Sequence, residues 1–191
     1  MNESQISYGN CKSISKIEDS LIIKEIKKLP SKINSYPIVI DSNILFLNNE
    51  INTKEVCDIL NEIMEYELAG VVRYTHSSMM VSGPYRLPIV TFLKEQAAES
   101  LLHAQLAGEK IAGLDGHPSQ KIAKIEETGQ HTIRDILEES LEHELHAVGL
   151  YKKLLAEVED SSIYLEEYAR GMIGEEEQHS LELKRMLKDY G

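Results

Sequence analysis

The sequence predicts an all-α protein made of a four-helix bundle, residues 52–191, and a partly irregular N-terminal extension, residues 1–51. Two observations indicate the bundle. Apolar residues recur at spacings of three and four through four long segments, which is the pattern of helices that bury one face. The connection between the second and third segments is much longer than the other two, so the chain can cross the whole bundle there.

The composition is that of a globular protein that needs neither disulfides nor a membrane. Of the 191 residues, 42% are hydrophobic and 27% are charged, and the formal net charge is −12, so a phosphate backbone is an unfavourable partner. The two cysteines form no Cys-x-x-Cys pair. No apolar stretch reaches the length of a membrane span, and the first residues lack the pattern of a secretory signal. We therefore expect a cytoplasmic protein that binds neither nucleic acid nor membranes.

The extension is polar over residues 1–16 and then carries short apolar segments. Residues 17–28 predict a short helix, which Pro30 ends because proline cannot continue a helix. Residues 38–40 and 44–47 are apolar runs that predict short strands or extended segments on either side of a turn. These patterns assign no function to the extension.

The first helix of the bundle is predicted over residues 52–81. Asn52 and Glu55 have the spacing of a capping box, in which each side chain accepts a hydrogen bond from the other residue's backbone amide. The Gly83-Pro84 pair ends this helix. A second helix follows over about residues 87–113, because the proline near its start is tolerated in a first turn.

The third helix is predicted over about residues 130–158, after a long connection at residues 114–127. The fourth helix runs from the Asp160-Ser161-Ser162 turn to about Tyr190. Short turns make the first and second helices antiparallel, and likewise the third and fourth. A helix of about 27 residues is about 40 Å long. A link of about 14 residues spans about 45 Å when extended, so it can cross the bundle.

One stripe of each helix is apolar except near its middle, where charged side chains take the places of leucines. These side chains are Glu67 in the first helix, Glu99 and His103 in the second, Glu144 in the third, and Glu176 and His179 in the fourth. An isolated ionised carboxylate is unstable in an apolar interior, and several that face one another also repel. A pair of divalent or trivalent cations removes both penalties. Carboxylates with one imidazole per metal suit iron or manganese, with zinc as a common occupant.

The spacing of these residues nearly matches the ligand pattern of di-iron bundle proteins. That pattern has one Glu on each of two helices and a Glu-x-x-His pair on each of the other two. Glu176 and His179 form such a pair, whereas the position three residues before His103 is Ser100. Glu99 lies four residues before His103, and residues four apart also share a helix face. We therefore expect Glu99 to be the ligand, with a local bulge in the second helix.

At these residues the chain resembles bacterioferritin and its Dps-like relatives in the ferritin-like di-iron superfamily. The resemblance covers about residues 55–190 and rests on three segments, which are Glu67 to Tyr74, Leu141 to Leu145, and Glu175 to His179. It implies a ferritin-like fold with one long crossover between helices 2 and 3. It also implies two iron ions per chain, oxidation of Fe(II) by O2 or H2O2 at a ferroxidase centre, and iron storage in a homo-oligomeric cage. In this interpretation Glu99 and Glu144 are the candidate bridging ligands.

Four other residues are interpreted together with the resemblance. Tyr74 follows the first glutamate by seven residues on the same stripe and is a candidate electron donor to the metals. A core tyrosine with a satisfied hydroxyl is the alternative for Tyr74. Leu101 takes the place of the methionine that binds haem in bacterioferritins, so we expect no haem of that kind. His143 and His146 flank the glutamate of the third helix and are expected on solvent-facing sides of that helix.

Two other classes of function remain open. A di-metal oxidoreductase, such as a peroxidase, a manganese catalase-like enzyme or an oxygenase, would use the same ligands without storing iron. A structural helical protein would use the glutamates as a polar seam and bind no metal. DNA shielding, as in some Dps proteins, is disfavoured by the net charge of −12 and by the absence of a basic tail.

Overall fold

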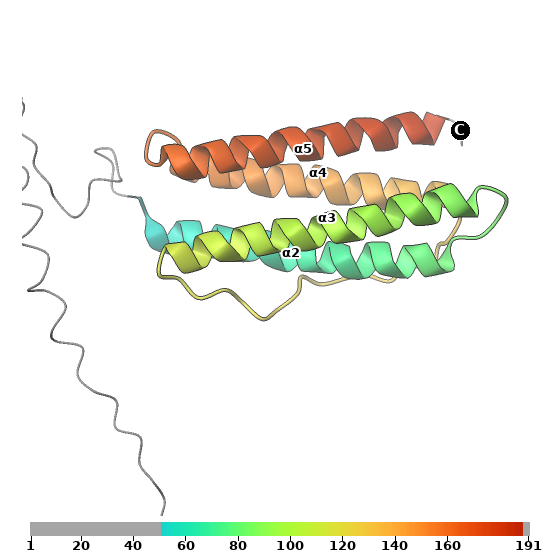
Figure 1. The fold of residues 1–191 in the computed structure, drawn as a ribbon, viewed down its shortest axis with the longest axis horizontal. Coiled ribbons are helices and arrows are strands. Elements are labelled where there is room, and N and C mark those ends of the chain that lie inside the picture. The colour runs from blue at the N-terminus through green and yellow to red at the C-terminus, as the bar shows by residue number, and fades with distance from the viewer. Residues whose placement is uncertain (1–50, 189–191) are drawn as a thin grey trace, which may run out of the picture. The chain divides into compact units, whose positions relative to one another are not determined.

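The computed structural model describes residues 51–188, and over this range the chain forms four long helices and no strand (Figure 1). The helices are α2 (Thr53–Met80), α3 (Arg86–Gly113), α4 (Ile133–Val158) and α5 (Ile163–Leu187). The predicted all-α four-helix bundle is therefore confirmed. The helix and the apolar runs predicted within residues 1–50 lie outside the described residues.

Polar side chains cap three of the four helices at their N-termini. The Asn52 side chain accepts a hydrogen bond from the backbone amide of Glu55 at 3.3 Å, which is one half of the predicted capping box. A complete capping box forms at the start of α4, where Thr132 and Asp135 each accept from the other residue's backbone amide. This box explains why α4 begins at Ile133, later than the predicted start near residue 130.

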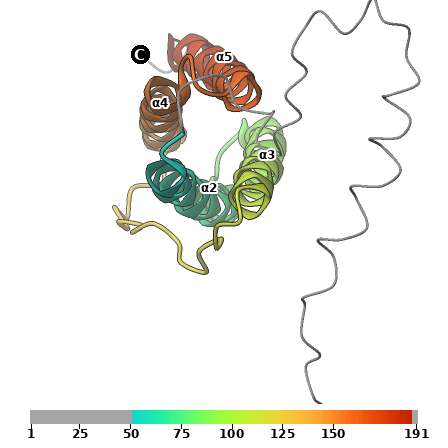
Figure 2. The ribbon, with the colours of Figure 1, turned by 90° about the vertical axis from the view of Figure 1, so that its left-hand side faces the viewer.

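The four helices form a ring in which α2 packs against both α3 and α4, and α4 packs against α5 (Figure 2). The short connections at residues 81–85 and 159–162 make α2 antiparallel to α3, and α4 antiparallel to α5. Helices α3 and α5 face each other across the remaining side of the ring (Figure 2). The bundle therefore consists of two helical hairpins that enclose a common interior.

The predicted long crossover connects α3 to α4 and runs along the outer side of α2 (Figure 1). Asn61 fixes its first part, because its side chain donates to the carbonyl of His117 at 3.3 Å and accepts from the amide of Ser119 at 2.7 Å. Further along, the amide of Ala123 donates to the carbonyl of Glu65 at 2.9 Å. The crossover is thus attached to α2 over several turns.

The interior contains two apolar clusters separated by a band of buried polar residues. The larger cluster includes Leu60, Ile111, Leu154 and Leu165. The smaller cluster includes Val81, Ile89, Leu93 and Ile136. The polar band includes Glu67, Ser100, His103, His143, Glu144 and Glu176. Because burying a charge is costly without a partner, this band is where a ligand or a counter-charge is needed. None of the described helices is long and apolar enough to cross a membrane.

Candidate metal centre

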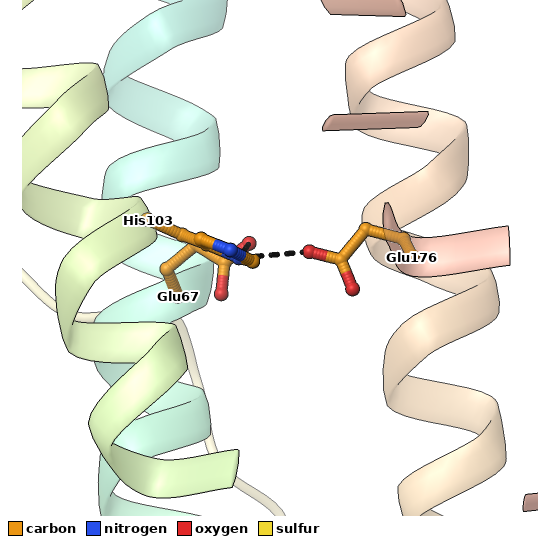
Figure 3. A group of neighbouring side chains, drawn as sticks. All are labelled: Glu67, His103 and Glu176. Atoms are coloured by element: carbon orange, nitrogen blue, oxygen red, sulfur yellow. Dashed lines mark ion pairs between the residues drawn. The ribbon is translucent and has the colours of Figure 1, made fainter. Parts of the chain in front are cut away.

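The first group of potential metal ligands joins the two hairpins. Glu67 on α2, His103 on α3 and Glu176 on α5 are all buried and offer ligand atoms that lie within 4.8 Å of one another (Figure 3). The Nδ1 atom of His103 lies 2.9 Å from Oε1 of Glu176 and 3.7 Å from Oε1 of Glu67. One imidazole and two carboxylates therefore converge on one point of the interior.

The second group shares one carboxylate with the first. It consists of Glu144 on α4 together with Glu176 and His179 on α5. The Nδ1 atom of His179 lies 3.2 Å from Oε2 of Glu176 and 3.6 Å from Oε2 of Glu144. Glu176 thus directs Oε1 towards the first group and Oε2 towards the second. The carboxylate common to both groups is Glu176, whereas the bridging ligands predicted from the sequence are Glu99 and Glu144.

Glu99 lies at the rim of the site and not in its interior. Its side chain is 36% exposed, and its Oε1 atom lies 3.4 Å from Nε2 of His179. Its other oxygen accepts a hydrogen bond from Gln96 at 3.1 Å. Helix α3 continues as a regular helix through this point, so the predicted bulge is absent from α3. The position of the missing Glu-x-x-His glutamate is occupied by Ser100, which is buried.

Glu175 also approaches the site, and the sequence interpretation missed it. Its Oε2 atom lies 3.4 Å from Nε2 of His103, although its side chain is 57% exposed. Glu99, His103 and Glu175 form a third, more exposed group of potential ligands. The spacing of four residues places Glu175 and His179 on one helix face, but spacing does not show that Glu175 reaches His103.

Two buried tyrosines donate hydrogen bonds to Glu67 and Glu144. Each of these two carboxylates belongs to only one of the two buried ligand groups. Tyr74 on α2 donates a hydrogen bond to Oε1 of Glu144 on α4. Tyr151 on α4 donates one to Oε1 of Glu67 on α2, at 3.1 Å. Both tyrosines are almost fully buried. Hydrogen bonds of this kind orient ligand side chains before a metal arrives.

Burial and the two imidazoles set the charges of the site. Burial raises the pKa of the Glu67 carboxyl, and it raises the pKa of Glu144 to about 8. Burial acts on Glu176 in the same direction, but hydrogen bonds from His103 and His179 outweigh it and lower the pKa of Glu176 below its ordinary value. The site is therefore built around one firmly ionised carboxylate.

The two histidines supply the counter-charge. Burial disfavours the protonated form of His103, yet hydrogen bonds to Glu176 and Glu67 outweigh burial and raise its pKa to about 10. Hydrogen bonds to Glu144 and Glu176 likewise raise the pKa of His179 to about 10. A cation that binds both groups must displace these protons, because metal ligands bind in their deprotonated form.

The donor set fits a pair of metal ions. Three buried carboxylates face one another, and their only strong counter-charges among the described residues are two imidazoles that can themselves become ligands. Oxygen donors with one imidazole for each position suit iron or manganese. His103 would serve the first position and His179 the second, with the Glu176 carboxylate between them.

His143 is a buried residue, so the expectation that it faces solvent was wrong. Only 2% of its surface is exposed, and burial lowers its pKa to about 3. Neither ring nitrogen has a hydrogen-bond partner within residues 51–188. Helix α4 packs against both α2 and α5, so its buried face is wider than one stripe. His146 is exposed, as expected.

Gly70 provides the space that the His143 ring occupies. A Cβ atom at position 70 would lie 2.6 Å from Nε2 of His143 and 2.9 Å from Oγ of Ser100. Any side chain at this position would therefore push into both neighbours. The buried ring of His143 thus depends on a glycine three residues after the candidate ligand Glu67.

The fold and the site define the class of protein. A four-helix bundle with one long crossover, whose interior holds carboxylate and histidine groups from all four helices, is the architecture of di-metal carboxylate proteins. Residues 57–190 match the sequence profile of the ferritin-like domain. The chain belongs to the ferritin-like domain family.

Solved structures of similar proteins agree with this assignment. A ferritin-like di-iron-carboxylate protein from Bacillus anthracis is 26% identical, with a TM-score of 0.67 over 73% of this chain and 99% of that chain. The bacterioferritin of Rhodobacter capsulatus is 26% identical, with a TM-score of 0.63 over 72% and 86% of the two chains. A dodecameric thioferritin from Bacteroides fragilis is 22% identical and shares the fold, with a TM-score of 0.66 over 73% and 88%. No curated protein matches the chain.

Proposed function

We propose that this protein binds Fe(II) at a two-metal centre in the bundle and oxidises it with O2 or H2O2, for iron storage and detoxification. The observation that carries the proposal is the position of Glu176, whose two oxygens face two separate ligand groups. Glu67, His103 and Glu176 would hold one iron ion. Glu144, Glu176 and His179 would hold the other, with Glu99 at the rim.

The bound metals would supply the redox chemistry, and the chain's own residues would bind, orient and protect them. The apolar clusters on both sides of the polar band limit the access of water to the site. Tyr74 is the candidate electron donor, since its hydroxyl already shares a hydrogen bond with Glu144. Its proton can move to that carboxylate when the ring loses an electron. The half-exposed Glu99 marks the side from which an ion can enter.

Storage would take place in a homo-oligomeric cage. Large apolar side chains are exposed on single chains at several places, and burial in an assembly would stabilise them. The most exposed are Leu87, Tyr164, Ile163, Met79 and Leu181, each between 61% and 74% exposed. The dodecameric state is stated for the thioferritin of Bacteroides fragilis, and it supports an assembly here by analogy only.

One observation favours a second candidate, a di-metal oxidoreductase that stores no iron. Ser100 stands where the ligand pattern has a glutamate, so the site has one carboxylate fewer in its interior. Fewer protein ligands leave more coordination positions for a substrate. Turnover of peroxide or of an organic substrate without mineral growth would favour this candidate.

The test is an anaerobic titration of the apo-protein with Fe(II), followed by addition of O2. We expect saturation near two iron ions per chain, rapid oxidation, and continued mineral growth when Fe(II) is added in excess. Glu144→Ala should abolish the rapid phase, whereas Glu142→Ala, an exposed neighbour, should retain it. An absence of Fe(II) binding above background would refute the proposal.

A further inference from the structure

The interior of the metal centre has one carboxylate too few to balance two divalent ions. Glu67, Glu144 and Glu176 carry three negative charges when they are all ionised, and an imidazole that binds a metal is neutral. Two divalent ions bring four positive charges. An uncompensated charge is unfavourable in a buried site, so a neutral centre needs one more anion.

Glu99 and Glu175 are further carboxylates near the site, but each lies behind an imidazole. Glu99 approaches Nε2 of His179 at 3.4 Å, and Glu175 approaches Nε2 of His103 at 3.4 Å. The two imidazoles direct their other nitrogen, Nδ1, towards the interior carboxylates. Because Nδ1 and Nε2 lie on different sides of a ring, Glu99 and Glu175 face the outer side of the site. Neither lies between the two ligand groups.

A buried serine occupies the position from which a fourth carboxylate would reach the centre. Ser100 lies three residues before His103, where the di-iron ligand pattern has a glutamate, and it is 6% exposed. Its Oγ atom lies 2.9 Å from the position of a Cβ atom at Gly70. The hydroxyl therefore points into the bundle, towards the turn of α2 that follows Glu67. The group by which a glutamate exceeds a serine has about the size of a small carboxylate.

A second buried hydroxyl lies at the same level of the bundle. Ser180 is on the buried face of α5, one turn after Glu176, and its Oγ atom has no hydrogen-bond partner within residues 51–188. Glu99 and His179 approach each other across α3 and α5. Ser100 and Ser180 directly follow them in the sequence, so the two serines lie at the same level. An unpaired buried hydroxyl is unfavourable, and an anion that accepts its hydrogen bond removes this cost.

We propose that the centre takes up a small external carboxylate, of the size of formate or acetate, which Ser100 and Ser180 hold by hydrogen bonds beside the two metal positions. This inference rests on the proposed function, because the anion needs a bound metal pair. Without metal ions, the three interior carboxylates repel it. The anion and the metal ions therefore raise each other's affinity by the same factor. The supply of small carboxylates would control how tightly the centre holds its metal ions.

Co(II) reports on both ligands without any oxidation. The apo-protein is titrated with Co(II) in a sulfonate buffer free of carboxylate, carbonate and phosphate, and the ligand-field absorbance is recorded at increasing concentrations of formate. We expect formate to lower the apparent Kd of Co(II) by about tenfold, with saturation, and chloride at the same ionic strength to leave it unchanged. Calorimetric titration of the Co(II)-loaded protein should detect saturable binding of formate, whereas the apo-protein should bind none.

Two variants and a matched control test the serines. Ser100→Glu supplies the missing carboxylate from the chain, so it should bind Co(II) tightly without formate and should not respond to formate. Ser180→Ala removes the second hydroxyl and should weaken formate binding by about tenfold. Ser140→Ala is the control, because Ser140 is also buried but its hydroxyl already donates to the carbonyl of Ile136 at 2.7 Å. Its affinity for formate should stay within about twofold of the unmodified value.

A Co(II) affinity of the unmodified protein that does not change with formate would overturn the proposal. A response to formate that appears only in Glu99→Gln would also overturn it, and would assign the fourth carboxylate to Glu99. A response that persists in Ser100→Glu would show that formate binds elsewhere, which again contradicts the proposal. Equal formate affinities in Ser180→Ala and Ser140→Ala would remove Ser180 from the anion site.

The same titrations distinguish this inference from the proposed function. If the unmodified protein binds neither Co(II) nor Fe(II), with or without formate, the proposed function fails and the carboxylate site fails with it. If both metals bind regardless of formate, and the bound Fe(II) is oxidised by O2, only the carboxylate site fails.

Discussion

Tyr151 of α4 donates a hydrogen bond of 3.1 Å to Glu67 of α2, although the two residues lie on different hairpins. The reverse contact is also present, because Tyr74 of α2 donates to Glu144 of α4. Each tyrosine follows the glutamate of its own helix by seven residues, which is close to two helical turns. Helices α2 and α4 therefore hold each other's carboxylates in a reciprocal arrangement across the centre of the bundle.

Removal of one of these hydroxyls should weaken the site without opening the fold. Tyr151→Phe leaves an oxygen of Glu67 without its donor, and the loss of such an orienting partner typically lowers metal affinity by about 10- to 100-fold. Titration with Co(II), followed by its ligand-field absorbance, measures this change. Tyr164→Phe is the control, because Tyr164 is exposed. Equal Co(II) affinity in both variants would show that the Tyr151 hydroxyl does not orient Glu67 for binding.

Glu176 should be the residue whose loss removes both metal ions. Glu176→Gln takes the shared carboxylate from both groups, whereas Glu67→Gln affects only the first group. We therefore expect the stoichiometry of bound Zn(II) to fall from two to near zero in the first variant and to about one in the second. Equilibrium dialysis with metal analysis measures it. Glu182→Gln, on an exposed part of α5, should retain both ions, and retention of two ions by Glu176→Gln would contradict the shared role.

The apo-protein should lose stability as the pH rises from neutral to alkaline. The pKa values of His103 and His179 are raised from 6.5 to about 10, so the folded state holds protons that the unfolded state releases above pH 6.5. The raised pKa of Glu144, about 8, acts in the same direction above pH 4.5. The stabilisation from the two histidines is complete below pH 6.5 and is lost as the pH rises through 10, whereas that from Glu144 is complete below pH 4.5 and is lost as the pH rises through 8. Thermal unfolding between pH 6.5 and 9.5 measures the decline.

Metal-loaded protein should show the opposite trend, since metal ions replace the bound protons and their affinity rises with pH. His179→Asn should flatten the profile of the apo-protein. An unfolding temperature of the unmodified apo-protein that stays constant over this range would argue against protonated imidazoles in the site.

Gly70→Ala should destabilise the bundle through overpacking. The new Cβ atom would lie 2.6 Å from His143 and 2.9 Å from Ser100, both of which are buried. Such crowding costs about 1–3 kcal/mol. Gly171→Ala is the matched control within a helix, because a Cβ at position 171 meets no atom within 4 Å. The control should gain up to about 1 kcal/mol from the higher helix propensity of alanine. Urea unfolding of both variants measures the difference.

The sequence was sufficient to predict the helices and five residues of the candidate metal centre for a clear physical reason. A charged residue in the middle of an apolar stripe is rare unless it has a partner, so Glu67, Glu144, Glu176, His103 and His179 stand out. The structure brings all five together. Periodicity also predicted the long crossover, because no helical pattern continues through residues 114–127.

The positions of Glu99, Glu175 and His143 could not be derived from the same pattern. A stripe shows which side of a helix is buried but not how wide the buried side is, and that width depends on how many neighbours the helix has. Helix α4 has two neighbours, so His143 is buried together with Glu144. Glu99 and Glu175 lie at the edges of their stripes, where spacing alone does not distinguish a rim position from an interior one.

The division of the ligands between the two hairpins has a consequence for the order of assembly. The second group draws Glu144, Glu176 and His179 from α4 and α5 alone, so it can form once that hairpin exists. The first group needs Glu67 and His103 from the other hairpin as well. A metal ion in the first group would therefore be a reversible cross-link between two halves of the chain that lie far apart in sequence. During biosynthesis, such an ion would bind only after both hairpins have formed, and it would then hold them together.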